Sequence, residues 1–384
     1  MKKRISILGA SGSVGSQSLE VAARGEYRVD FISGNRSIDK MESAARRFKP
    51  RIVAMADAEA AKALKIKLSD TNIRILSGED GILEGIQECG SDTVINAITG
   101  KAGLMPTLEI LESSSNLALA NKESLVVAGD IVMNKARSLG KTIIPIDSEH
   151  SAIFQSMMCG SHGEIKRIIL TASGGPFYGM SASELERVTA ADALSHPTWK
   201  MGKKITVDSA SLMNKGFEII EAAHLFDISA DKIEVVVHRE SILHSAVEYI
   251  DNAIIGELSV PDMRMCVQYA LEYPRRSAAV SASLDFASIG KLSFATPDKE
   301  TFSLLALAER AAHDGGASGA VLNAADEIAV EGFLSGKISF ARIADAVSKT
   351  YERLSSAKEE HSLEGILEYD IEAREKTKEL IYGK

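Results

Sequence analysis

The N-terminal part of the chain alternates short apolar runs with amphipathic stretches, and this alternation limits its fold more than any other feature. The runs with the length and composition of buried strands are RISILG, RVDFIS, RIVAM, DTVINAI, NLALA and TIIPI. Strands that alternate with helices form a parallel sheet covered by helices. We therefore expect a doubly wound, Rossmann-like α/β domain over residues 1–146.

The pattern changes after this domain. Further strands are expected in IKRIILTAS, KITVDS, IEVVVH, ILHSAVEYI and AIIGELSV, which predict a central α+β domain over residues 147–274 with a sheet open on one face. Inside it, residues 173–203 are rich in glycine, proline and small polar residues, which is typical of a flexible flap. We interpret residues 275–298 as a linker. Helical patterns that end in glycine predict a C-terminal helical domain over residues 299–384.

Composition excludes several classes of protein. A net charge of −9 argues against nucleic acid as a partner, and no apolar run of the sequence is long enough to span a membrane. Cys89, Cys159 and Cys266 show no paired spacing, which suits a reducing cytoplasm and gives no zinc motif. A phosphorylated substrate is compatible with this charge, provided that its site supplies local cations or backbone N–H donors.

A glycine-rich turn follows the first expected strand, with the pattern Gly9-x-x-Gly12-x-x-Gly15. Glycines let the backbone approach a pyrophosphate, and the N-terminus of the following helix supplies N–H donors. The pattern therefore favours dinucleotide binding over an ordinary turn.

The second strand ends in the segment GNRS at 34–37 rather than in an acid. An acid there would bind the ribose of NAD, whereas Arg36 with small polar neighbours suits the 2′-phosphate of NADP. A solvated loop arginine is the alternative interpretation of Arg36.

Two carboxylates, Asp147 and Glu149, follow the strand TIIPI directly. Residues two apart in an extended chain point the same way, and open α/β sheets bind ligands beyond the carboxyl ends of their strands. A third carboxylate, Glu218, lies at helical spacing from Asn214 and Lys215. Three carboxylates suit Mg²⁺ or Mn²⁺ better than Zn²⁺. The alternatives are a helix cap for the first pair, and a solvated face or an ion pair for Glu218.

The flap contains two further polar motifs. In TASGGPF, Ser173 and the glycine N–H groups predict an anion nest. In HPTWKMG, Trp199 either packs in a core or closes over a ligand. We expect structural roles for His238 and His244, which lie in expected strands.

Several longer motifs stand in order along the chain and resemble one enzyme family. They are GASGSVG, ANKESL, PIDSEHSAIFQ, TASGGPF, HPTWKMGKKITVDSASLMNKGFEIIEA and PDMR, spread from residue 5 to about residue 330. Together they resemble the 1-deoxy-D-xylulose 5-phosphate reductoisomerases of the non-mevalonate isoprenoid pathway. The resemblance implies an NADPH domain, a catalytic domain with a mobile flap, a C-terminal helical domain, a homodimer, and Mg²⁺ or Mn²⁺.

The resemblance also implies the reaction. The family isomerises its ketose phosphate to a branched aldehyde, which NADPH then reduces to 2-C-methyl-D-erythritol 4-phosphate. A divalent cation would polarise the ketone of the sugar. Binding of the distant phosphate would close the flap and exclude water.

Roles carry over position by position. The metal ligands are matched by Asp147, Glu149 and Glu218. The phosphate-binding positions are matched by Ser173, Ser209, Asn214 and Lys215. Other substrate contacts are matched by Lys122, Ser148 and His196, with Trp199 and Met201 on the flap. The expected catalytic groups are Lys122, Glu149 and His196. The cofactor positions are matched by Ser11, Gly12, Ser13, Val14, Gly34, Asn35, Arg36, Asn121, Glu123 and Gly202.

The sequence departs from the family pattern in two places. HRES at 238–241 stands where a His-Pro-Gln run is common, and GNRS at 34–37 places its asparagine differently. Two other functions stay open. An NADP-dependent polyol or semialdehyde dehydrogenase would share the N-terminal domain without needing three acidic ligands. A non-catalytic NADP sensor would bind the cofactor without oxidising it.

Overall fold

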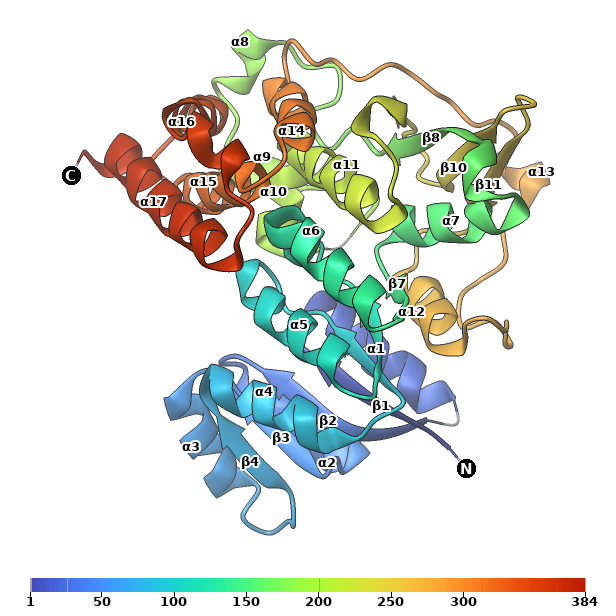
Figure 1. Cartoon of the computed structure of the whole chain (residues 1–384), viewed down its shortest axis with the longest axis vertical. Coiled ribbons are helices and arrows are strands. Elements are labelled where there is room, and N and C mark those ends of the chain that lie inside the picture. The colour runs from blue at the N-terminus through green and yellow to red at the C-terminus, as the bar shows by residue number, and fades with distance from the viewer. Residues whose placement is uncertain (1, 26, 200, 384) are drawn as a thin grey trace. The chain divides into compact units, whose positions relative to one another are not determined.

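The computed structural model describes residues 2–25, 27–199 and 201–383 (Figure 1). Its chain forms two compact units, each built from segments that are distant in sequence. The first unit consists of Met1–Ser124, Val132–Ser151 and Asp262–Ala282. The second unit consists of Leu125–Ile131, Ala152–Pro261 and Ser283–Lys384. The expected domain boundaries at 146, 274 and 298 stay predictions.

A parallel sheet forms the centre of the first unit. In the described part of the chain it has seven strands in the order β4-β3-β2-β1-β5-β6-β7. The strands are β1 (Lys3–Leu8), β2 (Tyr27–Gly34), β3 (Ile52–Met55), β4 (Arg74–Ser77), β5 (Thr93–Asn96), β6 (Asn116–Leu119) and β7 (Ile143–Pro145). The strand order reverses beside β1, which is paired with β2 on one side and β5 on the other. This topology confirms the Rossmann-like prediction, and it places a ligand crevice at the carboxyl end of β1.

Helices pack against this sheet, and their apolar sides complete its core. The helices that lie wholly or partly in the first unit are α1 (Ser13–Arg24), α2 (Ile38–Phe48), α3 (Ala58–Lys67), α4 (Gly78–Cys89), η1 (Lys101–Gly103), α5 (Leu104–Glu112), α6 (Glu123–Ser138), α7 (Ser148–Ser156) and α12 (Met263–Glu272). Among them, α4 contacts β2 and β3, and α12 packs along α1 (Figure 1). Ile5, Ile7 and Ile32 of the sheet are fully buried. Burial of such side chains stabilises the unit by about 1.5–3 kcal/mol each.

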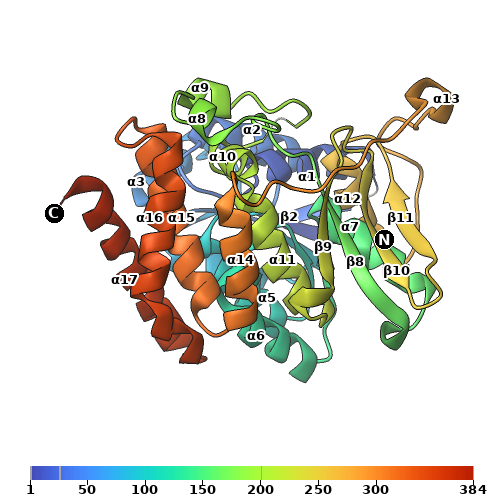
Figure 2. The ribbon, with the colours of Figure 1, turned by 90° about the horizontal axis from the view of Figure 1, so that it is seen from above.

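A mixed sheet forms part of the second unit, as the α+β prediction required. It has the order β11-β10-β8-β9 among the described strands, and Figure 2 shows these strands side by side. The strands are β8 (Ile165–Ala172), β9 (Ile233–Val237), β10 (Leu243–Tyr249) and β11 (Ile254–Leu258). Strand β9 runs parallel to β8, whereas β10 is antiparallel to both β8 and β11. The edge strand β11 follows β10 through a turn in which Asn252 has a φ of +67°.

The remaining elements of the second unit are mostly helical. The α-helices are α8 (Ala182–Leu185), α9 (Ala190–Ala193), α10 (Lys203–Ser211), α11 (Met213–Phe226), α13 (Phe286–Ile289), α14 (Ser303–Asp314), α15 (Ser318–Leu334), α16 (Phe340–Arg353) and α17 (Leu363–Tyr382). The 3₁₀ turns are η2 (Met157–Cys159), η3 (His162–Glu164), η4 (Ala230–Lys232) and η5 (Ser355–Glu359). Helix α15 packs against α16 and α17 (Figure 2). Among the described helices, none combines the length and apolar character needed to cross a bilayer.

One expected strand is wrong. The segment KITVDS lies in helix α10, which Gly202 precedes as the N-cap. Lys204 and Asp208 form an ion pair at 2.7 Å, four residues apart on this helix. Such a pair stabilises a helix but cannot form within one extended strand. Helix α10 ends where Leu212 adopts a φ of +60°, and α11 begins at the next residue.

Candidate active site

Two positions of the turn after β1 can be occupied only by glycine. Gly9 has a φ of +72°, and a Cβ there would lie 2.4 Å from the carbonyl oxygen of Ala97. A Cβ on Gly15 would lie 2.2 Å from the carbonyl oxygen of Gly9. Gly12 donates its N–H to that same oxygen at 2.9 Å, and helix α1 begins at Ser13. The turn therefore brings bare backbone and a helix N-terminus to the carboxyl end of β1, as a pyrophosphate site requires.

The end of β2 presents a cation at the same edge of the sheet. Arg36 is 81% exposed, and its Nε lies 2.9 Å from Oδ2 of Asp57. Asp57 also caps helix α3, and the N–H bond from Ala60 together with Arg36 lowers the pKa of Asp57. Lys40 of α2 reaches the carbonyl oxygen of Ser11 at 3.4 Å. These cations fit the extra phosphate of NADP, and Lys40 is one that sequence reasoning missed.

Asn121 and Glu123 follow β6 and brace the loop after β5. The side-chain amide of Asn121 donates to the carbonyl oxygens of Ile98 and Gly100 at 2.7 and 2.9 Å. It also donates to Oε2 of Glu123 at 2.9 Å. Glu123 is the first residue of α6, where its negative charge is favourable to the helix dipole. Both residues therefore shape the cofactor edge of the sheet.

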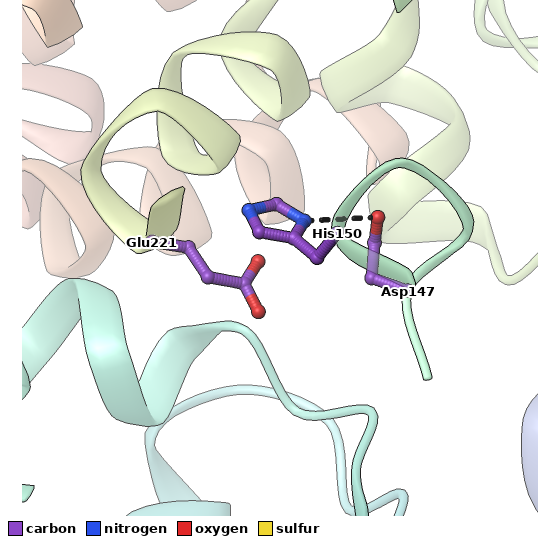
Figure 3. Close-up of side chains that lie close together, drawn as sticks. All are labelled: Asp147, His150 and Glu221. Atoms are coloured by element: carbon purple, nitrogen blue, oxygen red, sulfur yellow. Dashed lines mark hydrogen bonds and ion pairs between the residues drawn. The ribbon is translucent and has the colours of Figure 1, made fainter. Parts of the chain in front are cut away.

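The carboxylate of Asp147 lies directly beyond β7 and is surrounded by donors. Nζ of Lys122 lies 2.9 Å from Oδ2 of Asp147. Nδ1 of His150 donates to Oδ1 at 3.2 Å, as Figure 3 shows, and the backbone N–H of Glu149 also reaches Oδ1 at 3.2 Å. Burial by itself raises the pKa of Asp147, but Lys122 and His150 together outweigh it and hold the pKa well below its usual range. Asp147 is therefore ionised at neutral pH.

Asp147 has the helix-cap role that the sequence left open. The backbone N–H of Ser151 donates to the carbonyl oxygen of Asp147 at 2.8 Å, so Asp147 does start helix α7. The hydroxyl of Ser148 donates to Glu149. Oδ1 of Asp147 accepts the N–H of Glu149 in the first turn of this helix, and Oδ2 pairs with Lys122.

Two titratable residues near these motifs were missed by sequence reasoning. His150 is fully buried and orients Asp147 through the bond drawn in Figure 3. Glu221 is a buried carboxylate on α11. The signal for His150 was available, because a histidine three residues after a carboxylate shares its helical face.

Helix α11 of the second unit carries a buried polar cluster. Nδ2 of Asn214 donates to Oε1 of Glu218 at 2.6 Å, and the Lys215 ammonium pairs with Oε2 of the same carboxylate. Lys215 and Glu218 are both almost completely buried. The predicted shared face is confirmed, and the ion-pair interpretation of Glu218 is present in the structure.

The turn after β8, where the sequence predicts an anion nest, contains two consecutive glycines with positive φ. Gly174 and Gly175 have φ values of +75° and +68°, so consecutive N–H groups can face one side. The N–H of Gly175 donates to Oγ of Ser173 at 3.2 Å. A Cβ on Gly175 would lie 2.5 Å from the carbonyl oxygen of Ser209. The turn therefore packs closely against the backbone of Ser209, a predicted phosphate-binding residue.

His196 is neutral and its tautomer is fixed. Its Nδ1 accepts N–H bonds from Thr198 and Trp199 at 3.1 and 2.9 Å, so the proton resides on Nε2. Nε2 lies 3.0 Å from Oγ of Ser173 and donates to it. Burial, and secondly the charge of Arg239, lowers the pKa of His196 to about 4. Because Ser173 Oγ accepts this bond, its own hydroxyl proton points to another acceptor.

Other flap and strand residues have simpler placements. The ring of Trp199 lies 6.0 Å from that of His244, and Trp199 is half-buried. Met201 is also half-buried, and Gly202 is the N-cap of α10. Buried His238 donates to the carbonyl oxygen of Ser293 at 2.9 Å. A structural role for His238 agrees with this bond.

Comparison with known proteins gives matches along almost the whole chain. Models of the 1-deoxy-D-xylulose 5-phosphate reductoisomerase family match residues 5–129, and models of its C-terminal domains match residues 143–226 and 258–376. The reductoisomerase of Acetivibrio thermocellus is 48% identical over 381 residues, which cover 99% of this chain and 100% of that protein. The reductoisomerase of Caldanaerobacter subterraneus is 46% identical over 377 residues, which cover 97% and 98%.

Solved structures agree with these relatives. The Zymomonas mobilis reductoisomerase in complex with NADPH has a TM-score of 0.92 and 39% identity, and all of both chains is covered. A reductoisomerase in complex with NADPH, fosmidomycin and magnesium has a TM-score of 0.93 and 38% identity, with coverage of 98% and 99%. The fold of this chain is thus that of solved reductoisomerases. The chain belongs to the 1-deoxy-D-xylulose 5-phosphate reductoisomerase family.

Proposed function

We propose that this chain converts 1-deoxy-D-xylulose 5-phosphate to 2-C-methyl-D-erythritol 4-phosphate with NADPH and a divalent cation. One observation carries the proposal beyond family membership. A single parallel sheet holds the glycine turn after β1 and the Asp147 carboxylate after β7 at its carboxyl edge. A dinucleotide site and a cation ligand on one edge suit a reduction that also needs a Lewis acid.

The cofactor residues proposed here are those of the glycine turn and the end of β2. The turn is closed to any side chain at Gly9 and Gly15, so a pyrophosphate would contact backbone N–H groups. Arg36 and Lys40 would bind the 2′-phosphate through charge-assisted bonds. NADPH supplies the hydride for the reduction when it is bound.

The metal ligands proposed here are Asp147, Glu149 and Glu218. The donor set fits a hard divalent cation, because it consists of carboxylates and Asp147 is ionised at neutral pH. Magnesium is the cation of the related structures, and Mn²⁺ is the alternative. The cation supplies Lewis acidity at the ketone of the sugar when it is bound.

The side chains of the protein would bind and orient the sugar phosphate. Lys122 would donate to a sugar oxygen, and neutral His196 would hold Ser173 so that its hydroxyl donates to the phosphate. The other phosphate donors proposed here are Ser209, Asn214 and Lys215. Trp199 and Met201 would cover the substrate and exclude water.

Loss of NADPH absorbance with 1-deoxyxylulose 5-phosphate and Mg²⁺, with and without EDTA, tests the proposal. We expect turnover that EDTA abolishes and added Mg²⁺ restores. A simple dehydrogenase would continue in EDTA. A cofactor sensor would bind NADPH and oxidise none of it.

We also propose a homodimer, formed through the edge strand β11. Ile250 and Ile254, at the turn and the start of this strand, are 66% and 56% exposed, and Ile255 and Leu258 are exposed as well. An apolar edge strand tends to pair with another chain, and a second copy brings the same edge. Light scattering should show a dimer that Ile254→Lys weakens and Ile371→Lys, on exposed α17, does not.

We further propose that the protein resides in the cytoplasm and acts in isoprenoid synthesis.

A further inference from the structure

Arg239 lies between β9 and β10, where it binds the turn after β8. Its Nη1 donates to the carbonyl oxygens of Ser173 and Gly175, each at 2.7 Å. One nitrogen thus bonds the two carbonyls on either side of Gly174. Since these carbonyls are held on the arginine side and the Gly175 N–H donates to Ser173 Oγ, the hydroxyl proton of Ser173 is left to face an anion.

The same guanidinium reaches the start of the flap. It lies 5.0 Å from the ring centroid of Tyr178, in a cation–π contact. Tyr178 is largely exposed and lies three residues after Gly175. Arg239 therefore connects the anion nest with the segment that we expect to close.

The positive charge of Arg239 is not balanced by a carboxylate in the described part of the chain. The adjacent Glu240 is bonded elsewhere, to the hydroxyl of Ser293 at 2.7 Å and to His238 at 3.1 Å. The charge of Arg239 also contributes to the lowered pKa of His196, which donates to Ser173. A full positive charge thus acts on the nest, in a protein whose net charge is −9.

We propose that Arg239 is a positioning residue that sets the affinity of this protein for the phosphate of its substrate. It holds the Ser173–Gly175 turn in the shape that binds a dianion, and its charge adds to the attraction. The inference rests on the proposed assignment of Ser173 to the phosphate. Arg239 acts through the turn, so binding of the phosphate should suffer more than the chemical step.

The test uses the full-length protein with NADPH and Mg²⁺, and inorganic phosphate as a competitive inhibitor. Arg239→Met removes the charge and both bonds while keeping the apolar stem. We expect the inhibition constant of phosphate and the KM of the sugar phosphate to rise about tenfold or more, with a smaller change in kcat. Arg239→Lys keeps a charge and donors and should stay within about threefold of the wild type.

Arg187→Met is the matched control, because Arg187 is an exposed arginine on the same flap segment. It should leave both constants unchanged. NMR titration of His196 adds a readout that a merely structural clamp would not move. The pKa of His196 should rise from about 4 in Arg239→Met, because a neighbouring positive charge is removed, and should stay constant in the control.

The outcomes separate this inference from the function on which it rests. If Ser173→Ala leaves phosphate inhibition unchanged, the assignment of Ser173 is wrong. If Ser173→Ala weakens inhibition but Arg239→Met does not, only the role of Arg239 is overturned. Should Arg239→Met not fold, Arg239→Gln, which is also neutral, is judged by the same tenfold criterion.

Discussion

The ammonium of Lys122 lies 2.9 Å from Oδ2 of Asp147, and little of either side chain is exposed to solvent. The pair helps to keep the carboxylate ionised, since Lys122 and His150 together hold the pKa of Asp147 well below its usual range against the effect of burial. The same ammonium also repels any divalent cation that Asp147 binds. On the proposed metal site, Lys122 would therefore keep Asp147 ionised and at the same time weaken binding of the cation.

Lys122→Met should separate these effects. Removal of the ammonium takes away a repulsion, so we expect Mn²⁺ to bind up to about tenfold more tightly at pH 8. Turnover should fall by about a hundredfold or more, because a donor to the sugar oxygen is lost. Calorimetric Mn²⁺ titration and steady-state kinetics on one preparation measure both. Lys62→Met, on exposed α3, is the control. Weaker Mn²⁺ binding in Lys122→Met would contradict the repulsion.

Glu218→Gln tests whether Glu218 is the third metal ligand, as proposed. We expect Mn²⁺ affinity and activity to fall by about a hundredfold, while NADPH affinity stays normal because the glycine turn belongs to other strands. Because Glu218→Gln also breaks the buried ion pair with Lys215, it should lower the free energy of unfolding by about 3 kcal/mol. Stability alone therefore cannot separate the two roles of Glu218, but metal affinity can. Glu331→Gln, on the exposed side of α15, is the control. If Glu218→Gln bound Mn²⁺ as tightly as the wild type, Glu218 would not be a metal ligand.

Much of the first unit could be predicted from sequence, because its strands are short, apolar and buried. The missed strand is β4, whose segment RILS lies at the sheet edge and buries only Leu76. The segment KITVDS was mistaken for a strand because Ile205 and Val207 alternate with polar residues. The ion pair of Lys204 with Asp208 reveals the helix instead.

The candidate site was predictable where its residues are neighbours in the chain. The group Asp147, Ser148 and Glu149 and the face of Asn214, Lys215 and Glu218 both follow from local spacing. Arg239 was not predictable in this way, because the carbonyls it binds lie 64 and 66 residues earlier. Its role depends on the pairing of β8 with β9, which brings the two segments together.

Cofactor preference should depend on Arg36. The side chain is mostly exposed and is paired with Asp57, so it is available to a phosphate at little structural cost. We expect Arg36→Met to raise the KM for NADPH by about tenfold and to change the KM for NADH little, since only NADPH carries the 2′-phosphate. Arg137→Met, on an exposed turn of α6, is the control. Equal effects on both cofactors would exclude Arg36 from the 2′-phosphate site.

A buried cluster of three charged groups predicts how stability changes with pH. Nζ of Lys204 lies 2.7 Å from Oδ2 of Asp208 and 2.7 Å from Oδ2 of Asp326. Both carboxylates are buried, and one ammonium cannot balance two negative charges. Burial, and secondly the charge of Asp326, raises the pKa of Asp208 well above its usual value.

A raised pKa in the folded state fixes the sign of the pH dependence. Above the pKa of an unfolded aspartate, about 3.9, the folded protein retains a proton that the unfolded chain has released. The stabilisation is complete below that pH and is lost as the pH rises through the raised pKa of Asp208. The free energy of unfolding contributed by this cluster should therefore fall toward alkaline pH.

Asp326→Asn should remove this fall. The amide is nearly the same size, and it leaves Lys204 to balance Asp208 alone, so the pKa of Asp208 should drop. We expect the variant to be more stable than the wild type at pH 8, by on the order of 1–3 kcal/mol, with a smaller difference at pH 5. Urea unfolding at both pH values measures this, and Asp231→Asn, an exposed carboxylate, should behave as the wild type. If Asp326→Asn instead loses stability relative to the wild type, and loses more at pH 8 than at pH 5, then Asp208 and Asp326 are both ionised in the wild type. The two carboxylates would then stabilise the fold together. That result would contradict both the predicted repulsion between the two buried carboxylates and the predicted protonation of Asp208.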